Sequence, residues 1–240
     1  MNKTPGGWTV IDPKARVLTY QYAFNDQGST SNCFVARMGN GQLLVVSPAY
    51  RMTDAGFKEL DEHGEVGAIV ANNGFHHLGL AEWKARYPKA RLFASPLAQA
   101  RIQKKNPQAP KLESLDGLSP LLGEDVTFTD APATKCGESW VTAKIAGGVA
   151  WFVSDLLINL PKVAGPLPMR LLFKWTDSGP GFKVFHLTMK FTVKDKKQVL
   201  TALAAAMAEA PPTVIVPAHG AIMDQGGVAQ DAQKLLASFL

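Results

Sequence analysis

The chain has 240 residues, 46% of them hydrophobic and 19% charged, with a formal net charge of +5. This balance is typical of a globular protein and excludes wholesale disorder, and the length suits one large domain better than two. No stretch approaches the 18 or so uncharged apolar residues of a membrane-spanning helix, and the two cysteines imply no disulfide framework.

Strands are predicted over most of the first fifty residues. Aromatic and β-branched residues alternate with polar ones over 16–24 and 32–38, GNGQ is typical of a hairpin turn, and LLVVSP predicts the next strand. Thr53 is expected to cap a helix that runs to about Glu62 and ends at His63-Gly64.

Strands and helices then alternate. EVGAIVAN predicts a buried strand, AEWKARYP a short helix closed by Pro88, and ARLFAS another strand, after which Pro96 opens a helix to about Lys105. Residues 106–122 are rich in Pro, Ser and Gly, so we expect a linking loop there.

The second half of the chain also contains predicted strands and helices, and one unusual segment lies among them. VTFTD, ESWVTAKI, GVAWFVSD and TVIVPA predict strands, and helices are expected over 195–209 and from about Gln230. Residues 159–190 carry four prolines among aromatic residues, and His186, within FKVFHLTMKF, is expected in a strand. This segment would form a hydrophobic lid over a pocket or part of a dimer interface, and the sequence leaves both open. The order of elements predicts a layered α/β protein with helices outside a sheet core, as a single domain over 1–240.

The excess positive charge is local. Between Ala81 and Lys111 there are eight Lys and Arg residues and one Glu. Either these residues form a surface that binds an anionic partner, or they lie on the solvent-exposed faces of two helices. Because no motif of interleaved aromatic and basic residues accompanies them, we expect no nucleic-acid partner.

We expect a small-molecule substrate and no membrane partner. The N-terminal residues lack the apolar core of a signal peptide, which favours a cytoplasmic location.

Residues suited to metal binding follow three predicted strands. His76 and His77 come after AIVANNGF, Asp155 after VAWFVS, and His219 after TVIVPA. Ligands usually bind at the carboxyl ends of strands in α/β sheets. Imidazole and carboxylate groups suit zinc and other borderline metals.

Each residue taken singly has another explanation. Asp155 is also suited to capping a turn, and His219-Gly220 to a turn bonded to backbone. Adjacent histidines diverge on a helix, but a loop removes that objection. His63 lies at an expected helix end, and Cys33 is expected to be a core thiol. Taken together, the strand-end residues favour a metal site.

The order of strands, these strand-end residues and the closing VIVPAHG resemble the metallo-β-lactamase fold of metal-dependent hydrolases over nearly the whole chain. The resemblance implies a four-layer αββα sandwich. That family carries H-x-H-x-D-H after a strand, a histidine before a Pro-Gly turn, an aspartate after a strand and a final histidine. Its typical members hold two metal ions and a bridging water.

Three of the seven implied ligands are missing. The signature aligns best with Asn72, Gly74, His76 and His77, and a register one residue later gives Asn73, Phe75, His77 and Leu78. Thr134 stands in place of the histidine before the Pro-Gly turn. Three donors of one metal position are therefore lost, whereas the resemblance implies that His76, His77, Asp155 and His219 remain for the other. Cys136, near this position, is either a ligand, a redox-sensitive thiol or a packing residue.

The resemblance implies a hydrolase of an ester, lactone, thioester or related acyl bond, with one divalent ion, most suitably zinc, with iron or manganese as alternatives. Asp155 or His76 is then a candidate general base. Two alternatives remain open: a non-catalytic binding or structural module whose metal site is vestigial, and oxidation-reduction chemistry at iron.

Overall fold

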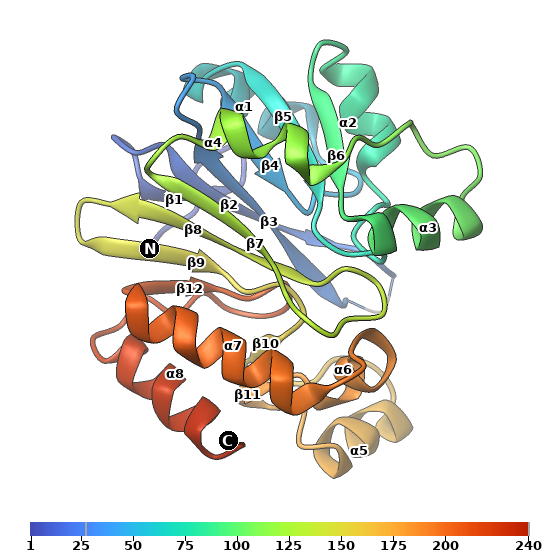
Figure 1. Ribbon diagram of the computed structural model, residues 1–240, viewed down its shortest axis with the longest axis vertical. Coiled ribbons are helices and arrows are strands. Elements are labelled where there is room, and N and C mark those ends of the chain that lie inside the picture. Colours follow the sequence, from blue (N-terminus) through green and yellow to red (C-terminus); the bar gives the residue numbers. More distant parts are fainter. Residues whose placement is uncertain (27, 240) are drawn as a thin grey trace.

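The computed structural model describes residues 1–26 and 28–239, and two mixed sheets form its centre (Figure 1). The first sheet has six strands in chain order: β1 (Trp8–Asp12), β2 (Val17–Ala23), β3 (Thr30–Arg37), β4 (Leu43–Val46), β5 (Val66–Ala71) and β6 (Arg91–Ala94). Neighbours from β1 to β4 are antiparallel, and β4, β5 and β6 are parallel.

The second sheet has four strands in the order β12 (Val214–Val216), β9 (Gly148–Phe152), β8 (Ser139–Ile145) and β7 (Val126–Asp130). β12 pairs parallel to β9, and the other pairs are antiparallel. A separate antiparallel hairpin, β10 (Leu157–Leu160) with β11 (Gly181–Val184), extends from the end of β9.

An apolar layer joins the inner faces of the two sheets. Phe34 and Ala36 of β3 face Val141 of β8 and Phe152 of β9 in one buried cluster. The Phe34 and Phe152 rings stack with centroids 5.8 Å apart. Successive side chains of a strand point to opposite faces, so the alternate residues of β3, such as Val35, enter the outer cluster instead.

Helices cover both outer faces. α1 (Asp54–His63), α2 (Leu80–Arg86) and α3 (Pro96–Lys105) cover the first sheet, and α7 (Lys196–Glu209) and α8 (Val228–Ala237) cover the second. Trp83 anchors α2: it is fully buried, and its Nε1 donates to the Ala49 carbonyl at 2.8 Å. The expected four-layer αββα architecture is confirmed (Figure 1).

Two local predictions are wrong. The expected loop over 106–122 contains a 3₁₀ turn, Leu115–Gly117, and the short helix α4 (Ser119–Leu122), which begins with Pro120 in its first turn. His186 begins helix α6 (His186–Thr192) rather than continuing strand β11. The alternating apolar residues of FKVFHLTMKF suit a strand, but Met189 packs into the core of the second sheet whereas Phe191 stays 67% exposed.

The segment 159–190 folds around helix α5 (Leu167–Trp175), which lies between β10 and β11 in the chain and has no buried residue. Among the described helices none has the length and apolar character needed to cross a membrane.

Part of the excess positive charge between residues 81 and 111 is paired with acidic groups just outside that segment. Arg86 pairs with Asp61 of α1 at 2.5 Å, and Arg91 with Glu113 at 2.6 Å. These pairs are consistent with charged helix and strand faces in solvent.

Candidate metal centre

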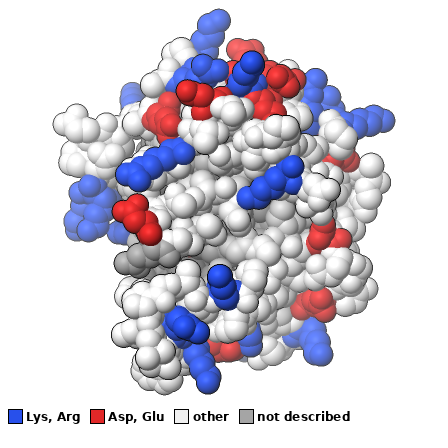
Figure 2. Space-filling model, turned by 180° about the vertical axis from the view of Figure 1, so that it is seen from behind, with Lys and Arg blue, Asp and Glu red and all other residues white. Residues whose placement is uncertain are grey.

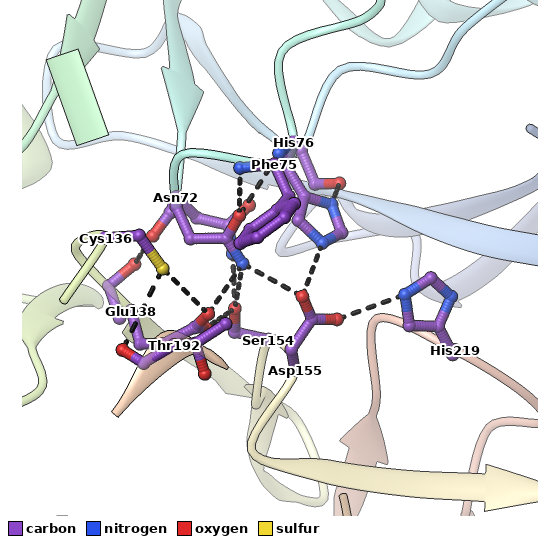
Figure 3. Close-up of polar contacts among 12 residues, drawn as sticks. Asn72, Phe75, His76, Cys136, Glu138, Ser154, Asp155, Thr192 and His219 are labelled. Carbon is purple, nitrogen blue, oxygen red and sulfur yellow. Dashed lines mark hydrogen bonds and ion pairs between the residues drawn. The ribbon is translucent and has the colours of Figure 1, made fainter. Parts of the chain in front are cut away.

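Three chain turns meet at one edge of the sandwich. Because β9 and β12 are parallel, the residues after them, Asp155 and His219, lie at the same edge of the second sheet. The turn after β5 brings His76 to them from the first sheet (Figure 3). Asn32 of β3 ties the sheets together here, because its amide donates to the Pro217 carbonyl at 2.8 Å.

Asp155 lies between the two imidazoles (Figure 3). Its Oδ2 is 3.2 Å from His76 Nε2, and its Oδ1 is 3.1 Å from His219 Nε2. One donor atom from each of the three residues lies within 4.8 Å of the others, a spacing that can hold a metal ion. Asp155 and His76 are buried, and His219 is partly exposed.

The Asp155 carboxylate is ionised. Burial by itself would raise its pKa, but the His76 and His219 imidazoles outweigh burial and hold that pKa well below its ordinary value. Burial likewise lowers the pKa of His219, but the Asp155 carboxylate reverses the effect and the net shift is upward. The carboxylate supplies the negative charge of the centre.

A second contact orients each ring. His219 Nδ1 lies 2.7 Å from the Thr30 carbonyl, which can only accept, so Nδ1 carries a hydrogen. In a neutral imidazole Nε2 is then the lone-pair nitrogen that faces Asp155. His76 Nδ1 lies 2.6 Å from the Ser47 hydroxyl, which places its Nε2 toward Asp155 in the same way. Such partners are typical of metal-binding histidines.

A buried network of polar side chains contacts the Asp155 carboxylate and fixes its position. The Asn73 amide donates to Asp155 Oδ2 at 3.1 Å and to Glu138 Oε1 at 3.0 Å. The Ser154 hydroxyl donates to Glu138 Oε2 at 2.6 Å and accepts from the Asn72 amide at 2.6 Å. Burial, reinforced by the charge of Asp155, raises the pKa of Glu138 to about 8. This network holds Asp155 in one orientation.

The sequence prediction did not include several of these residues. Ser47, Thr30 and Glu138 lie in segments without a metal-binding pattern, and Ser154 directly precedes Asp155 but is not a typical metal ligand. Asn73 entered only through the alternative register of the signature. The only signal was the pair Asn72-Asn73 directly after a buried strand.

The structure brings together three of the four predicted ligands. His77 is not a member of the converging group. Its ring lies against the backbone of Gly74 and Phe75 and near Arg101, and burial lowers its pKa. Neighbouring residues of a tight turn point in different directions, so only one imidazole of the pair reaches Asp155.

The positions of the missing donors are filled or closed. The Asn72 amide is bonded to Ser154. A Cβ at Gly74 would lie 2.5 Å from Arg101 Cδ, which leaves no room for a side chain. Thr134 is buried and bridges to Val193. Cys136 is buried, burial raises its pKa to about 12, and its Sγ lies 4.0 Å from Glu138 Oε1; it is not in the converging group.

The donor set suits a divalent metal ion. Two imidazoles and one carboxylate form a set used by catalytic zinc and by non-haem iron. Asp155 Oδ1 is buried and has no well-aligned hydrogen bond from any described residue, although His219 Nε2 is near. A cation between these atoms would satisfy both.

An apolar cavity of about 720 Å³ adjoins His219. The Phe24 and Phe185 rings flank the imidazole, with centroids 5.4 Å and 5.9 Å from it. Met169 and Phe173 of α5 line the same cavity. The inner side of the 159–190 segment therefore covers a pocket, one of the two roles that the sequence left open.

The chain resembles solved structures, but its sequence does not match known families or curated proteins. No protein-family model and no curated protein matches the chain. The structure of the DIM-1 metallo-β-lactamase exposed to ceftazidime aligns with a TM-score of 0.58 at 14% identity over 99% of both chains.

Two further structures are similar. FIM-1 from Pseudomonas aeruginosa, in its mono-zinc form, gives a TM-score of 0.57 at 13% identity over 99% of this chain and 97% of that one. The metal-soaked Flv1 flavodiiron core from Synechocystis sp. PCC6803 gives 0.57 at 14% identity over 92% of this chain and 59% of that one. At such low identity the likeness establishes the fold alone: the chain has the metallo-β-lactamase fold.

Proposed function

We propose that the chain is a metal-dependent hydrolase of an ester, lactone, thioester or related acyl bond, with one divalent ion held by His76, Asp155 and His219. The observation that carries this proposal is the convergence of these three donor atoms within 4.8 Å of one another, beside an apolar cavity. Zinc suits the donor set best, and iron and manganese are alternatives.

The local structure favours one ion rather than two. A glycine at 74 supplies no side chain, the Asn72 amide is bonded within the buried network, and Thr134 is buried against Val193. The FIM-1 structure, which shares the fold, was obtained in a mono-zinc form.

A divalent ion bound there would supply a Lewis acid that polarises an acyl carbonyl and lowers the pKa of water toward about 7. The chain's own residues supply the charge and the orientation that this chemistry needs. Asp155 stays ionised and contributes the negative charge, and the Ser47 and Thr30 contacts aim both Nε2 atoms at one point. With His76 bound to the ion through Nε2 and bonded to Ser47 through Nδ1, Asp155, whose carboxylate has a second oxygen, is the proposed acceptor of the proton released by the attacking water.

The cavity indicates the kind of acyl group. Phe24, Phe173 and Phe185 line it together with aliphatic side chains. Lys3, Lys162 and Asp224 also line it, but apolar side chains predominate. Because apolar surface desolvates a charged group without compensation, we propose substrates with an apolar acyl or aryl part.

A binding module without catalysis is the second candidate. In its favour, the Asp155 carboxylate lies 3.2 Å from His76 Nε2 and 3.1 Å from His219 Nε2 and accepts from the Asn73 amide, contacts that also suit a purely structural polar cluster. Iron-based oxidation-reduction is a third and minor reading of the same donor set.

Metal analysis and kinetics separate these candidates. Protein purified without added metal is analysed by elemental mass spectrometry, together with His219→Ala and, as a matched control, His63→Ala at the far end of α1. We expect bound zinc near one equivalent, lost in His219→Ala and retained in His63→Ala.

Aryl esters, lactones and thioesters are then tested with and without a chelator, for the wild type and for Asp155→Asn. The hydrolase requires turnover that falls with the chelator and in Asp155→Asn. Protein that holds no metal and shows no turnover would favour the binding module. Full activity in Asp155→Asn would mean that the turnover does not arise at this centre.

A further inference from the structure

Helix α5 has two apolar sides. Leu167, Leu171 and Trp175 are spaced by four residues and so share one side of the helix. Met169 and Phe173, also four apart, lie on the opposite side and line the cavity. The inner side therefore has a structural role, whereas the side chains of the outer side are mostly exposed.

The outer side is exposed to solvent. Leu167 is 63% exposed, Leu171 56% and Trp175 83%. Phe191 of α6, 67% exposed, adds to this apolar surface, and the neighbouring Lys190 places its Nζ 5.9 Å from the Trp175 ring centroid. An apolar surface of this kind usually marks an interaction site.

Positive charges border the apolar side chains. Arg170 and Lys174 lie on the flank of α5, and with Lys162 they line a shallow hollow that also includes Leu167 and Leu171. None of the described residues that line this hollow is acidic. Neither Arg170 nor Lys174 forms an ion pair with any residue that the structure describes.

The same end of the molecule has few acidic groups. Figure 2 shows a largely uncharged surface with several Lys and Arg side chains at the end where α5 lies, whereas acidic and basic side chains are mixed in a dense cluster at the opposite end. The surface therefore suits a partner that is apolar in its interior and negatively charged at its boundary.

We propose that the outer side of α5, with Phe191 and Lys190 of α6, docks on the surface of a lipid bilayer that contains anionic lipids. Leu167, Leu171 and Trp175 would enter the region between head groups and acyl chains, while Arg170, Lys174 and Lys190 contact the lipid phosphates. Exposed leucine and tryptophan beside lysine and arginine is the composition of helices that lie in this interface.

The charges favour a lipid surface over a second copy of the chain. A two-fold symmetric dimer would place the same surface on both sides of the interface. Arg170 and Lys174 would then face a partner surface with the same cations, and Asp177, two residues beyond Trp175, already pairs with Lys183 at 2.9 Å, so the contact is repulsive. The proposal departs from the expectation of no membrane partner, but it concerns contact with the surface and not a span. It does not depend on the hydrolase proposal.

Tryptophan fluorescence reports directly on this surface. The chain has five tryptophans, and four of them are buried: Trp8, Trp83, Trp140 and Trp151. A shift of emission to shorter wavelength, or quenching by brominated lipids, therefore arises from Trp175.

The experiment uses the full chain and flotation of vesicles made of phosphatidylcholine with or without phosphatidylglycerol. We expect flotation with the anionic vesicles, a shift in Trp175 emission, and loss of both at high salt. Arg170→Glu/Lys174→Glu should weaken binding about tenfold or more. Leu171→Ser should weaken it as well.

Two matched controls lie on α3, away from this surface. Lys104→Glu/Lys105→Glu makes the same change in net charge, and Leu97→Ser removes a leucine that is 42% exposed. Both should bind as the wild type does. Circular dichroism checks that every variant is folded.

Absence of flotation with either kind of vesicle would overturn the proposal. So would equal loss in the two charge-reversal variants, because binding would then follow net charge alone. A dimer seen by light scattering that is abolished by Leu171→Ser, without vesicle binding, would assign the surface to a second copy instead.

Discussion

Glu138 shows how a single buried carboxyl can organise the centre. It is fully buried, and it accepts hydrogen bonds from the Asn73 amide and the Ser154 hydroxyl. Asn73 in turn donates to Asp155, and Ser154 precedes Asp155 in the chain. The position of the Asp155 carboxylate therefore depends on a residue that does not belong to the converging group.

Substitutions at Glu138 should separate hydrogen bonding from charge. Because burial raises its pKa to about 8, the group is mostly protonated at neutral pH, and Glu138→Gln replaces it with a neutral group of similar shape. We expect Glu138→Gln to change the free energy of unfolding by less than about 1 kcal/mol, and Glu138→Ala to lower it by about 2–4 kcal/mol.

Urea denaturation of the metal-free protein at pH 7 measures both changes. The Ala variant leaves the Asn73 amide and the Ser154 hydroxyl short of a partner and opens a cavity, which explains the larger loss. Equal losses for Gln and Ala would mean that the negative charge of Glu138, rather than its hydrogen bonds, stabilises the fold.

At the scale of elements, helix α5 and the hairpin β10–β11 form one structural unit beside the centre. The chain leaves β9, forms β10, crosses α5 and returns along β11, so that α5 covers the cavity next to His219. Phe173, on the inner side of α5, contacts Phe185 with ring centroids 5.8 Å apart. Met169 and Phe173 of this helix thus form part of the cavity wall.

Phe173→Ala should enlarge the cavity and weaken the fit of an apolar acyl group. If the chain hydrolyses such substrates, we expect kcat/KM for an apolar aryl ester to fall about tenfold or more, mainly through KM. Phe191→Ala, on the outer surface, is the matched control and should leave both constants unchanged. A fall in kcat at constant KM would place Phe173 nearer the reacting atoms than its position in the cavity implies.

At the scale of the whole molecule, the apolar layer between the two sheets holds together the residues that form the centre. His76 comes from the first sheet, and Asp155 and His219 come from the second. The distance between the sheets therefore sets the distances within the centre, and the stack of Phe34 on Phe152 lies in that layer.

Phe34→Ala should lower the free energy of unfolding by about 3–5 kcal/mol, because it leaves a cavity between two packed sheets. Phe191→Ala removes the same side chain from an exposed position and should change it by less than about 0.5 kcal/mol. Urea denaturation compares the two variants. A small effect of Phe34→Ala would indicate that the sheets move together to fill the space.

The sequence by itself determined most elements, because hydrophobic period and capping residues are local signals. Thr53 does cap α1, accepting from Gly56 N–H at 3.1 Å, and Pro96 does open α3. The strand-end positions of His76, Asp155 and His219 also followed from the sequence, since each comes just after an apolar run. The four-layer architecture came from the resemblance that these features carry, and the structure confirms it.

Only the tertiary structure decided which of two adjacent histidines joins Asp155, because that depends on the direction of each side chain in the turn after β5. It also brought the Ser47 hydroxyl, the Thr30 carbonyl and Glu138 to the centre from segments far apart in the chain. Hydrogen bonds between such segments leave no periodic pattern in a sequence, since they form only once the two sheets have packed face to face.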